Sequence, residues 1–166
     1  MAKPLVSVVM GSDSDLDVMK EAVRVLSELG VSSEVQILSA HRSPERVSRY
    51  CKNLPKHGIK IVIAGAGGAA HLAGVIAAHT IVPVIGVPID SSSLNGLDSL
   101  LATVQMPSGI PVATMAIGKS GAANAGVLAA QILAIRSKTL RSKLLKHKVK
   151  LAQSVVDKNN RIQGKV

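Results

Sequence analysis

The pair His41-Arg42 places a side chain that can exchange protons beside one that can bind an anion, within the segment Ser39-Ala40-His41-Arg42. An imidazole can accept or release a proton near neutrality because its ordinary pKa is about 6.5. A guanidinium can clamp a phosphate or a carboxylate with two parallel hydrogen bonds. Many such pairs are simply surface residues, so this one indicates a site only if the fold brings similar groups to it.

A second segment with suitable chemistry is Gly11-Ser12-Asp13-Ser14-Asp15, which leads directly into a predicted helix. The first turn of a helix has free N–H groups and the positive end of the helix dipole, and both favour a bound anion. The hydroxyls of Ser12 and Ser14 can donate to phosphate oxygens, whereas Asp15 would repel phosphate and suits sugar hydroxyls. The alternative is that these side chains only cap the helix.

A third segment, residues 64–74, reads Ala-Gly-Ala-Gly-Gly-Ala-Ala-His-Leu-Ala-Gly and has few large side chains. Exposed backbone N–H groups in such a run can bind a ligand, and the candidate contacts are Gly67, Ala70, His71 and Leu72. The alternatives are tight backbone packing at a sheet edge or a subunit contact, with His71 bonded within its own loop. The run superficially resembles a dinucleotide-binding fingerprint, but that fingerprint belongs after the first strand.

The sequence contains neither a phosphate-binding loop ending in Gly-Lys-Ser/Thr nor His or Cys pairs at metal-ligand spacing. We therefore expect an enzyme that uses no ATP, no metal and no other cofactor. Cys51 is the only cysteine, so no disulfide can form within one chain, which fits a reducing cytoplasm. We find no export signal and no stretch apolar enough to span a bilayer, and we expect a cytoplasmic protein with no membrane partner.

The elements that must position these segments follow the pattern of an α/β protein, in which short β-branched runs alternate with helices and the sheet is parallel. The predicted strands span residues 5–10, 33–38, 60–64, 83–87 and 112–117, four of them nearly continuously apolar, as strands buried on both faces are. Ligands of open parallel sheets bind beyond the carboxyl ends of the strands, where the three segments lie. Gly30 is expected to end the first helix, and Ser43 to cap a second helix that begins at Pro44.

Residues 120–136 predict a helix that is apolar on nearly its whole circumference, with Gly121 and Gly126 allowing backbones to approach closely. A helix of this kind must be buried. In a chain of 166 residues some of that burial is expected to come from other copies of the chain. The sequence therefore predicts a homo-oligomer.

The positive charge lies mostly at the C-terminus. Residues 136–166 carry ten Lys or Arg against Asp157 alone, which leaves +1 of the net charge of +10 for the remaining chain. We interpret residues 1–136 as a catalytic α/β domain and residues 137–166 as a basic helical extension of the same domain, its apolar stripe packed back on the body. An RNA-binding arm is the alternative, but Tyr50 is the only aromatic residue, so bases have no stacking platform and we expect no nucleic-acid partner.

Taken together, the loops resemble one family, the catalytic subunits of phosphoribosylaminoimidazole carboxylase, whose bacterial members are N5-carboxyaminoimidazole ribonucleotide mutases of purine biosynthesis. The resemblance covers about residues 5–135. It rests on motifs spread over several loops: Met10-Gly11-Ser12, Ser14-Asp15, Ser39-Ala40-His41-Arg42, residues 64–70 with His71-Leu72, Val104-Gln105-Met106-Pro107, Pro111-Val112-Ala113-Thr114, Ala116-Ile117-Gly118 and Gly121-Ala122-Ala123-Asn124-Ala125.

The resemblance implies a flavodoxin-like three-layer sandwich that assembles as an octamer and moves a carboxylate from N5 of its ribonucleotide substrate to C4 of the imidazole ring. By resemblance, Ser12, Asp15 and Arg42 bind the ribonucleotide, and His41 is the catalytic acid–base. Such a transfer adds a proton to a nitrogen and removes one from C4, and an imidazole can do both near neutrality. The remaining candidate substrate contacts are Gly11, Ser14, Ser39, Gly67, Ala70, His71 and Leu72.

The family has a second branch, which carboxylates aminoimidazole ribonucleotide directly with carbon dioxide. The sequences Ser-Ala-His-Arg and Gly-Gly-Ala-Ala-His-Leu favour the mutase branch, and direct carboxylation is the alternative. Ala73 departs from the family pattern, because proline is common there, which puts the rigidity of the loop in doubt. Receiver-type signalling modules share this fold, but they need a phosphorylatable Asp at the end of strand three, where this chain has Ala64-Gly65-Ala66.

Overall fold

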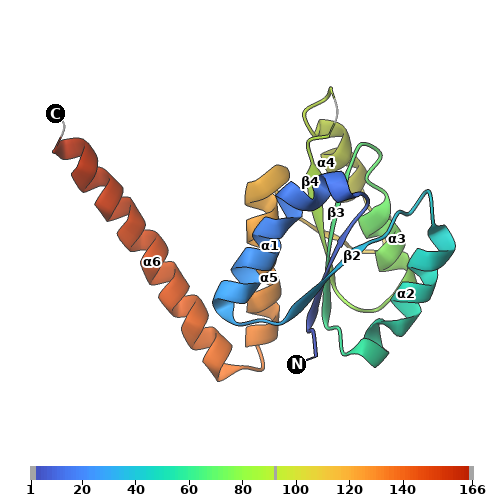
Figure 1. Cartoon of the computed structure of the whole chain (residues 1–166), viewed down its shortest axis with the longest axis horizontal. Coiled ribbons are helices and arrows are strands. Elements are labelled where there is room, and N and C mark those ends of the chain that lie inside the picture. Colours follow the sequence, from blue (N-terminus) through green and yellow to red (C-terminus); the bar gives the residue numbers. More distant parts are fainter. Residues whose placement is uncertain (1–2, 92, 165–166) are drawn as a thin grey trace. The chain divides into compact units, whose positions relative to one another are not determined.

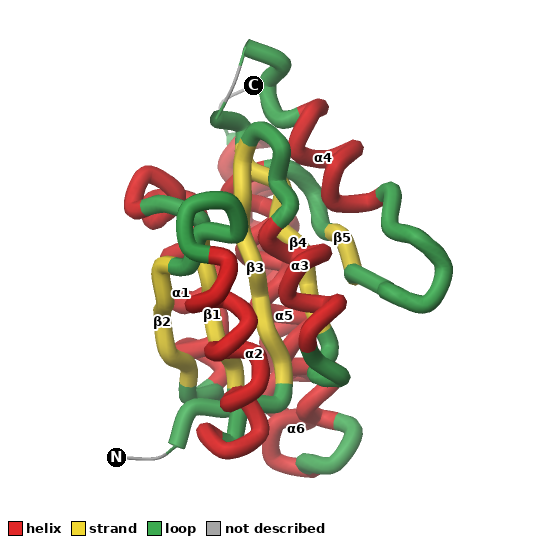
Figure 2. Tube along the Cα trace, turned by 90° about the vertical axis from the view of Figure 1, so that its right-hand side faces the viewer, coloured by secondary structure: helices red, strands yellow, loops and turns green. Residues whose placement is uncertain are grey.

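A computed structural model describes residues 3–91 and 93–164, and it contains a five-stranded parallel sheet in the order β2-β1-β3-β4-β5 (Figures 1 and 2). The strands are β1 (Val6–Met10), β2 (Ser33–Ile37), β3 (Ile61–Gly67), β4 (Val84–Ile89) and β5 (Ala113–Thr114). A short 3-10 helix (Asp13–Asp15) precedes α1 (Leu16–Leu29), followed by α2 (Pro44–His57), α3 (Leu72–His79), α4 (Leu97–Val104), α5 (Gly118–Ala134) and α6 (Lys138–Gln163). The predicted α/β class with a flavodoxin-like sheet is confirmed.

The chain divides into two compact units, Met1–Ala129 and Ala130–Val166. The first unit contains the whole sheet, and the second contains the end of α5 and all of α6. The predicted helix of the basic extension is present as α6, which ends at Gln163, and residues 165–166 of that extension lie outside the described part. The predicted domain boundary at residue 136 stays a prediction.

All five predicted strands are present, and two of them extend further than the sequence indicates. β3 continues to Gly67 and β4 to Ile89, so both reach further toward the ligand end of the sheet. The predicted strand at 112–117 is wrong in length, because only Ala113 and Thr114 pair with β4. β2 is an edge strand whose outer residues Val35 and Ile37 are exposed, so it is not buried on both faces.

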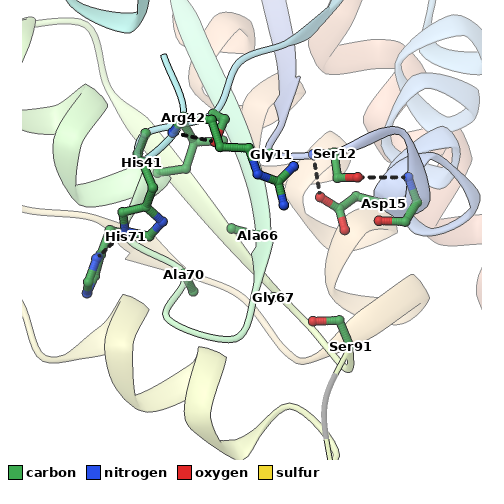
Figure 3. A pocket seen from close by; sticks show the side chains of 14 residues that line it. Gly11, Ser12, Asp15, His41, Arg42, Ala66, Gly67, Ala70, His71 and Ser91 are labelled. Carbon is green, nitrogen blue, oxygen red and sulfur yellow. Dashed lines mark hydrogen bonds between the residues drawn. The ribbon is translucent and has the colours of Figure 1, made fainter. Parts of the chain in front are cut away.

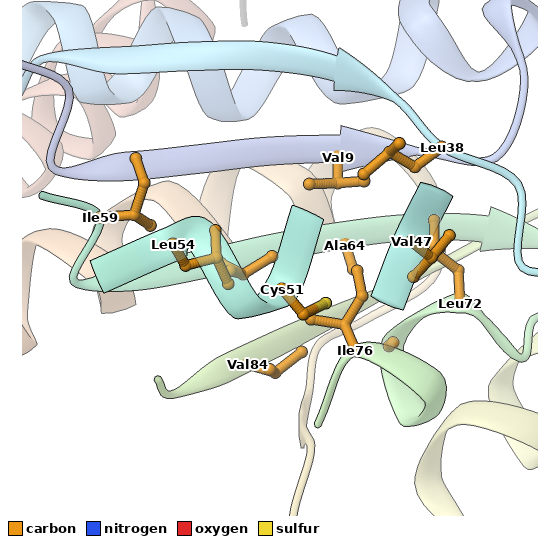
Figure 4. Close-up of a cluster of buried hydrophobic side chains, with 12 residues drawn as sticks. Val9, Leu38, Val47, Cys51, Leu54, Ile59, Ala64, Leu72, Ile76 and Val84 are labelled. Atoms are coloured by element: carbon orange, nitrogen blue, oxygen red, sulfur yellow. The ribbon is translucent and has the colours of Figure 1, made fainter. Parts of the chain in front are cut away.

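One face of the sheet is covered by α2 and α3 (Figure 4). Val47, Cys51 and Leu54 lie on one face of α2 at helical spacing and are fully buried against the sheet, where Ile76 of α3 joins them. Burial raises the pKa of the Cys51 thiol to about 11, so this cysteine stays protonated and chemically inert. This core holds α2 in place, and the candidate site residues His41 and Arg42 lie just before that helix.

The opposite face is covered by α1 and the first part of α5. Gly126 allows these helices to approach closely, because a Cβ there would lie 3.0 Å from the carbonyl oxygen of Ala22. The alanines Ala122 and Ala125 are fully buried, whereas Val127 and Leu128 are only partly buried in the single chain. Within one chain, the burial of α5 is therefore incomplete at Val127 and Leu128.

Candidate active site

A cavity of about 260 Å³ lies at the carboxyl ends of β1 to β4 (Figure 3). This is the edge of the sheet at which open parallel sheets bind ligands, next to the point where the strand order reverses. All the site residues predicted from the sequence line the cavity: Gly11, Ser12, Ser14, Asp15, Ser39, His41, Arg42, Gly67, Ala70, His71 and Leu72. Ala40, Ala66 and Ser91 line it as well.

The loop after β1 forms a turn that uses its own side chains. The carboxylate of Asp15 accepts the backbone N–H of Ser12 at 3.0 Å, and the Ser12 hydroxyl oxygen accepts the N–H of Ser14 at 3.3 Å. The Ser12 hydroxyl itself donates to Asp13 at 3.0 Å. The capping geometry considered as the alternative is thus present. Because Ser12 and Asp15 also line the cavity, the same bonds fix both side chains where a ligand would meet them.

Asp15 is a nearly buried carboxylate in this wall, with 5% of its surface exposed. Burial raises the pKa of Asp15 above its ordinary value of 3.8, and the N–H groups of Ser12 and Gly11 offset part of that rise. The folded protein therefore holds this proton to a higher pH than the unfolded chain does. Stability falls as the pH rises from 3.8 through the raised pKa, and above that window the ionised carboxylate costs stability.

Replacing Asp15 with asparagine is expected to leave the melting temperature at pH 7 equal to or above that of the wild type, since the amide oxygen can still accept the Ser12 N–H without a buried charge. The substrate KM is expected to rise at least about tenfold, because the resemblance implies that Asp15 binds the substrate and a hydrogen bond to a charged group contributes about 1.5–3 kcal/mol. Thermal unfolding between pH 3 and 7, together with Michaelis curves, checks both effects. A large fall in melting temperature at pH 7 would mean that the carboxylate is a structural cap.

The turn after β2 presents His41 and Arg42 at the surface of the cavity. The Ser39 hydroxyl oxygen accepts the backbone N–H of Arg42 at 3.1 Å, and the Ser39 carbonyl accepts both the N–H and the hydroxyl of Ser43, at 3.0 and 3.1 Å. The predicted cap on α2 is therefore wrong in detail, because the Ser43 side chain bonds back to Ser39 and makes no bond to the helix. The outcome is a rigid connection between the His41-Arg42 turn and α2.

His41 and His71 contact each other across the cavity wall although they are 30 residues apart (Figure 3). Nε2 of His41 lies 2.7 Å from Nδ1 of His71, and the rings meet edge to face with centroids 4.9 Å apart. One of these nitrogens must carry the proton, so the bond requires that at least one ring is neutral. Each ring thereby restricts the orientation and proton position of the other, which is the arrangement expected of an oriented acid–base group.

The glycine-rich segment turns sharply between β3 and α3. Gly68 and Ala70 adopt left-handed backbone angles, with φ of 60° and 43°, and the Ala70 N–H donates to the Gly67 carbonyl at 3.1 Å. A positive φ is strained for an alanine and persists where the surrounding structure requires it. Leu72 anchors the segment because its side chain is buried in the core. Near the two histidines, this turn lines the cavity with backbone and small side chains.

Ser91 is a lining residue that the sequence did not identify. It lies two residues after the end of β4. The sequence predicts that this strand ends at residue 87, just before Pro88, so Ser91 is not expected at the strand end. Proline is tolerated here because β5 pairs with β4 only at Ile85 and Gly86, so the end of β4 is open on that side. The useful signal was the general rule that the residues after every strand of such a sheet face the same edge.

Receiver modules cluster acidic residues after the first strand and a lysine after the fifth, and Asp13, Asp15, Asp17 and Lys119 imitate that arrangement without forming such a site. Lys119 bonds to Asp17 at 2.6 Å, and this contact, followed by that of Lys20, lowers the pKa of Asp17 to about 2. β3 has Ala64 and Gly65 near its end and no carboxylate. Within residues 3–91 and 93–164, no group of three His, Cys, Asp or Glu side chains could hold a metal ion, and no helix there could cross a membrane.

The fold and the position of the cavity define a flavodoxin-like α/β protein with a cavity at the carboxyl edge of its sheet, where such folds bind ligands. The family model described as AIR carboxylase matches residues 5–154, which reaches into α6. The chain belongs to the AIR carboxylase family, and the predicted resemblance is confirmed.

Named relatives agree with this assignment. A Pyrococcus horikoshii protein named N5-carboxyaminoimidazole ribonucleotide mutase is 65% identical over 76% of this chain and 71% of that protein. A Thermotoga maritima protein of the same name is 51% identical over 96% of this chain and 92% of its own length. The crystal structure of Treponema denticola PurE matches with a TM-score of 0.84 at 27% identity, over 95% of this chain and 98% of the other.

Proposed function

We propose that this enzyme converts N5-carboxyaminoimidazole ribonucleotide to 4-carboxy-5-aminoimidazole ribonucleotide, a step of purine biosynthesis. The observation that carries the proposal is the contact of His41 with His71 beside a cavity that Arg42, Ser12 and Asp15 also line. Proteins that are 51–65% identical to this chain over 76–96% of its length are named for that mutase activity.

The reaction moves one carboxylate and two protons, and the carboxylate must be kept from escaping to solvent. The N5–carboxylate bond breaks and N5 gains a proton, then the carboxylate carbon bonds to C4 and C4 loses its proton. The balance requires no oxidant and no co-reactant. His41 donates the first proton and accepts the second, so it returns to its starting state after each turnover. His71 orients His41 through their shared hydrogen bond.

The cavity offers groups for both ends of the substrate. Arg42 and the Ser12 turn bind the phosphate, and Asp15 accepts hydrogen bonds from the ribose hydroxyls. The backbone N–H groups from Gly67 to Ala70 hold the migrating carboxylate or carbon dioxide in place and keep water away from it. Gly11, Ser14, Ser39 and Leu72 complete the substrate contacts.

The alternative is direct carboxylation of aminoimidazole ribonucleotide by carbon dioxide. The test supplies purified protein with either N5-carboxyaminoimidazole ribonucleotide, or aminoimidazole ribonucleotide and bicarbonate, and follows the C4-carboxylated product. We expect rapid turnover of the first substrate without added bicarbonate. Turnover with the second pair only would replace the mutase proposal by direct carboxylation.

We further propose a homo-octamer. The side chains of Leu97, Leu101 and Val104 form an apolar stripe along α4 and remain 53%, 49% and 48% exposed in the single chain. A second copy of the chain would bury such a stripe. Light scattering of purified protein is expected to give a mass eight times 17.2 kDa. A mass of one chain at micromolar concentration would contradict the octamer.

The proposed substrate is a charged ribonucleotide that does not diffuse across membranes, which supports a cytoplasmic location. None of the proposed proton transfers requires a metal or another cofactor. The basic α6 has no assigned ligand, and nucleic acid is not a proposed partner.

A further inference from the structure

The Ser91 hydroxyl is a polar group in the cavity that the proposed mechanism does not use. Ser91 is exposed and lines the cavity, and Figure 3 shows its oxygen pointing toward the glycine-rich segment. Its side chain makes no hydrogen bond to any other residue in the described part of the chain. The hydroxyl therefore has both its donor and its acceptor capacity available for a ligand.

Two features fix the position of this hydroxyl. The Ser91 N–H donates to the Ile89 carbonyl at 3.0 Å, which ties the residue to the end of β4. Gly67, which pairs with Ile89 across the sheet, leaves room for the side chain. A Cβ at position 67 would lie only 1.7 Å from Ser91 Oγ and 2.6 Å from Ser91 Cβ, so any larger residue there would displace the serine. The absence of a side chain at Gly67 thus leaves room for the Ser91 hydroxyl in the cavity lining.

We infer that Ser91 binds the sugar-phosphate part of the substrate, an assignment that rests on the proposed function. In Figure 3 Ser91 lies on the side of the glycine-rich segment where Asp15 and Ser12 lie, whereas His41 and His71 lie on the other side. The histidine side holds the reacting carboxylate, and the other side holds the ribose and its phosphate. A free hydroxyl there donates to a phosphate or ribose oxygen and accepts from a ribose hydroxyl.

The test compares Ser91→Ala with Ser93→Ala, which removes a hydroxyl from the same loop outside the cavity lining. A neutral hydrogen bond contributes about 0.5–1.5 kcal/mol, so removing it weakens binding by roughly 2- to 12-fold. We expect Ser91→Ala to raise the substrate KM about fivefold with kcat within about twofold of the wild type. The dissociation constant of ribose 5-phosphate, measured by calorimetry, is expected to rise by the same factor, and Ser93→Ala is expected to change neither quantity.

Three outcomes would overturn the assignment of Ser91. The first is unchanged KM and unchanged ribose 5-phosphate affinity in Ser91→Ala. The second is a fall in kcat alone, which would place Ser91 at the reacting end. The third is an equal effect of Ser93→Ala, which would indicate a general change in the loop. If the wild type shows no turnover but Ser91→Ala still weakens ribose 5-phosphate binding, the proposed function fails, whereas Ser91 still binds a sugar phosphate.

Discussion

Replacing His41 with asparagine is expected to lower kcat by about 10²- to 10⁴-fold while the substrate KM changes little. A positioned acid–base group contributes about that factor, and asparagine can neither donate nor accept a proton near neutral pH. Ser12, Asp15 and Arg42 are unchanged in this variant, so the groups proposed to bind the ribonucleotide remain. Steady-state kinetics with N5-carboxyaminoimidazole ribonucleotide give both constants.

The matched control for this variant is His57→Asn. His57 is an exposed histidine at the end of α2, outside the cavity lining, so its replacement is expected to leave kcat unchanged. Near-normal turnover by His41→Asn would remove His41 from the acid–base role. A similar loss in both variants would point to damage to α2 instead of lost chemistry.

Replacing Arg42 with methionine is expected to raise the substrate KM by roughly 10- to 150-fold. Arg42 is exposed at the cavity and makes no salt bridge within the described residues, so its guanidinium is available to the substrate phosphate. Hydrogen bonds to charged groups contribute about 1.5–3 kcal/mol, which corresponds to that change in affinity. Methionine is about as long as the aliphatic part of the arginine side chain, but it has neither the charge nor any hydrogen-bond donor.

Arg46→Met is the control for Arg42, because Arg46 is an exposed arginine on the first turns of α2 that does not line the cavity. We expect its KM to equal that of the wild type, and we expect Arg42→Met to lose affinity for ribose 5-phosphate as well as for the substrate. Unchanged ribose 5-phosphate affinity in Arg42→Met would place Arg42 away from the phosphate.

The composition of the site could be predicted because the fold class and one geometric rule determine it. Once alternating strands and helices indicated a parallel sheet, the residues after β1, β2 and β3 had to share one edge. His41 and His71 were therefore expected in the same region, although their 2.7 Å contact depends on ring orientations that no spacing encodes. The sequence allows the Ser12 turn either to cap the helix or to face a ligand, and in the structure its residues make the capping bonds and also line the cavity.

The errors arose where tertiary contacts override local sequence preference. The segment at 112–117 has β-branched residues, yet β5 ends after two residues, and the Thr114 hydroxyl bonds to the carbonyl of Thr103 in α4. Ser43 precedes a proline, which is typical of a helix cap. In the structure its hydroxyl instead donates a hydrogen bond to the Ser39 carbonyl. Pro88 indicates the end of a strand, but β4 continues past Pro88 to Ile89, so the sequence pattern does not point to Ser91.

The fate of the substrate's own carboxylate tests the central claim most directly. Purified enzyme would receive N5-carboxyaminoimidazole ribonucleotide labelled with ¹³C in its carboxylate, in the presence of excess unlabelled bicarbonate, and the label in the C4-carboxylated product would be measured by mass spectrometry. In the proposed reaction the carboxylate stays in the cavity between bond breaking and bond formation, so we predict that most of the product retains ¹³C. A product that carries mainly unlabelled carbon would show that carbon dioxide enters from solution, and it would contradict carboxylate transfer within the site.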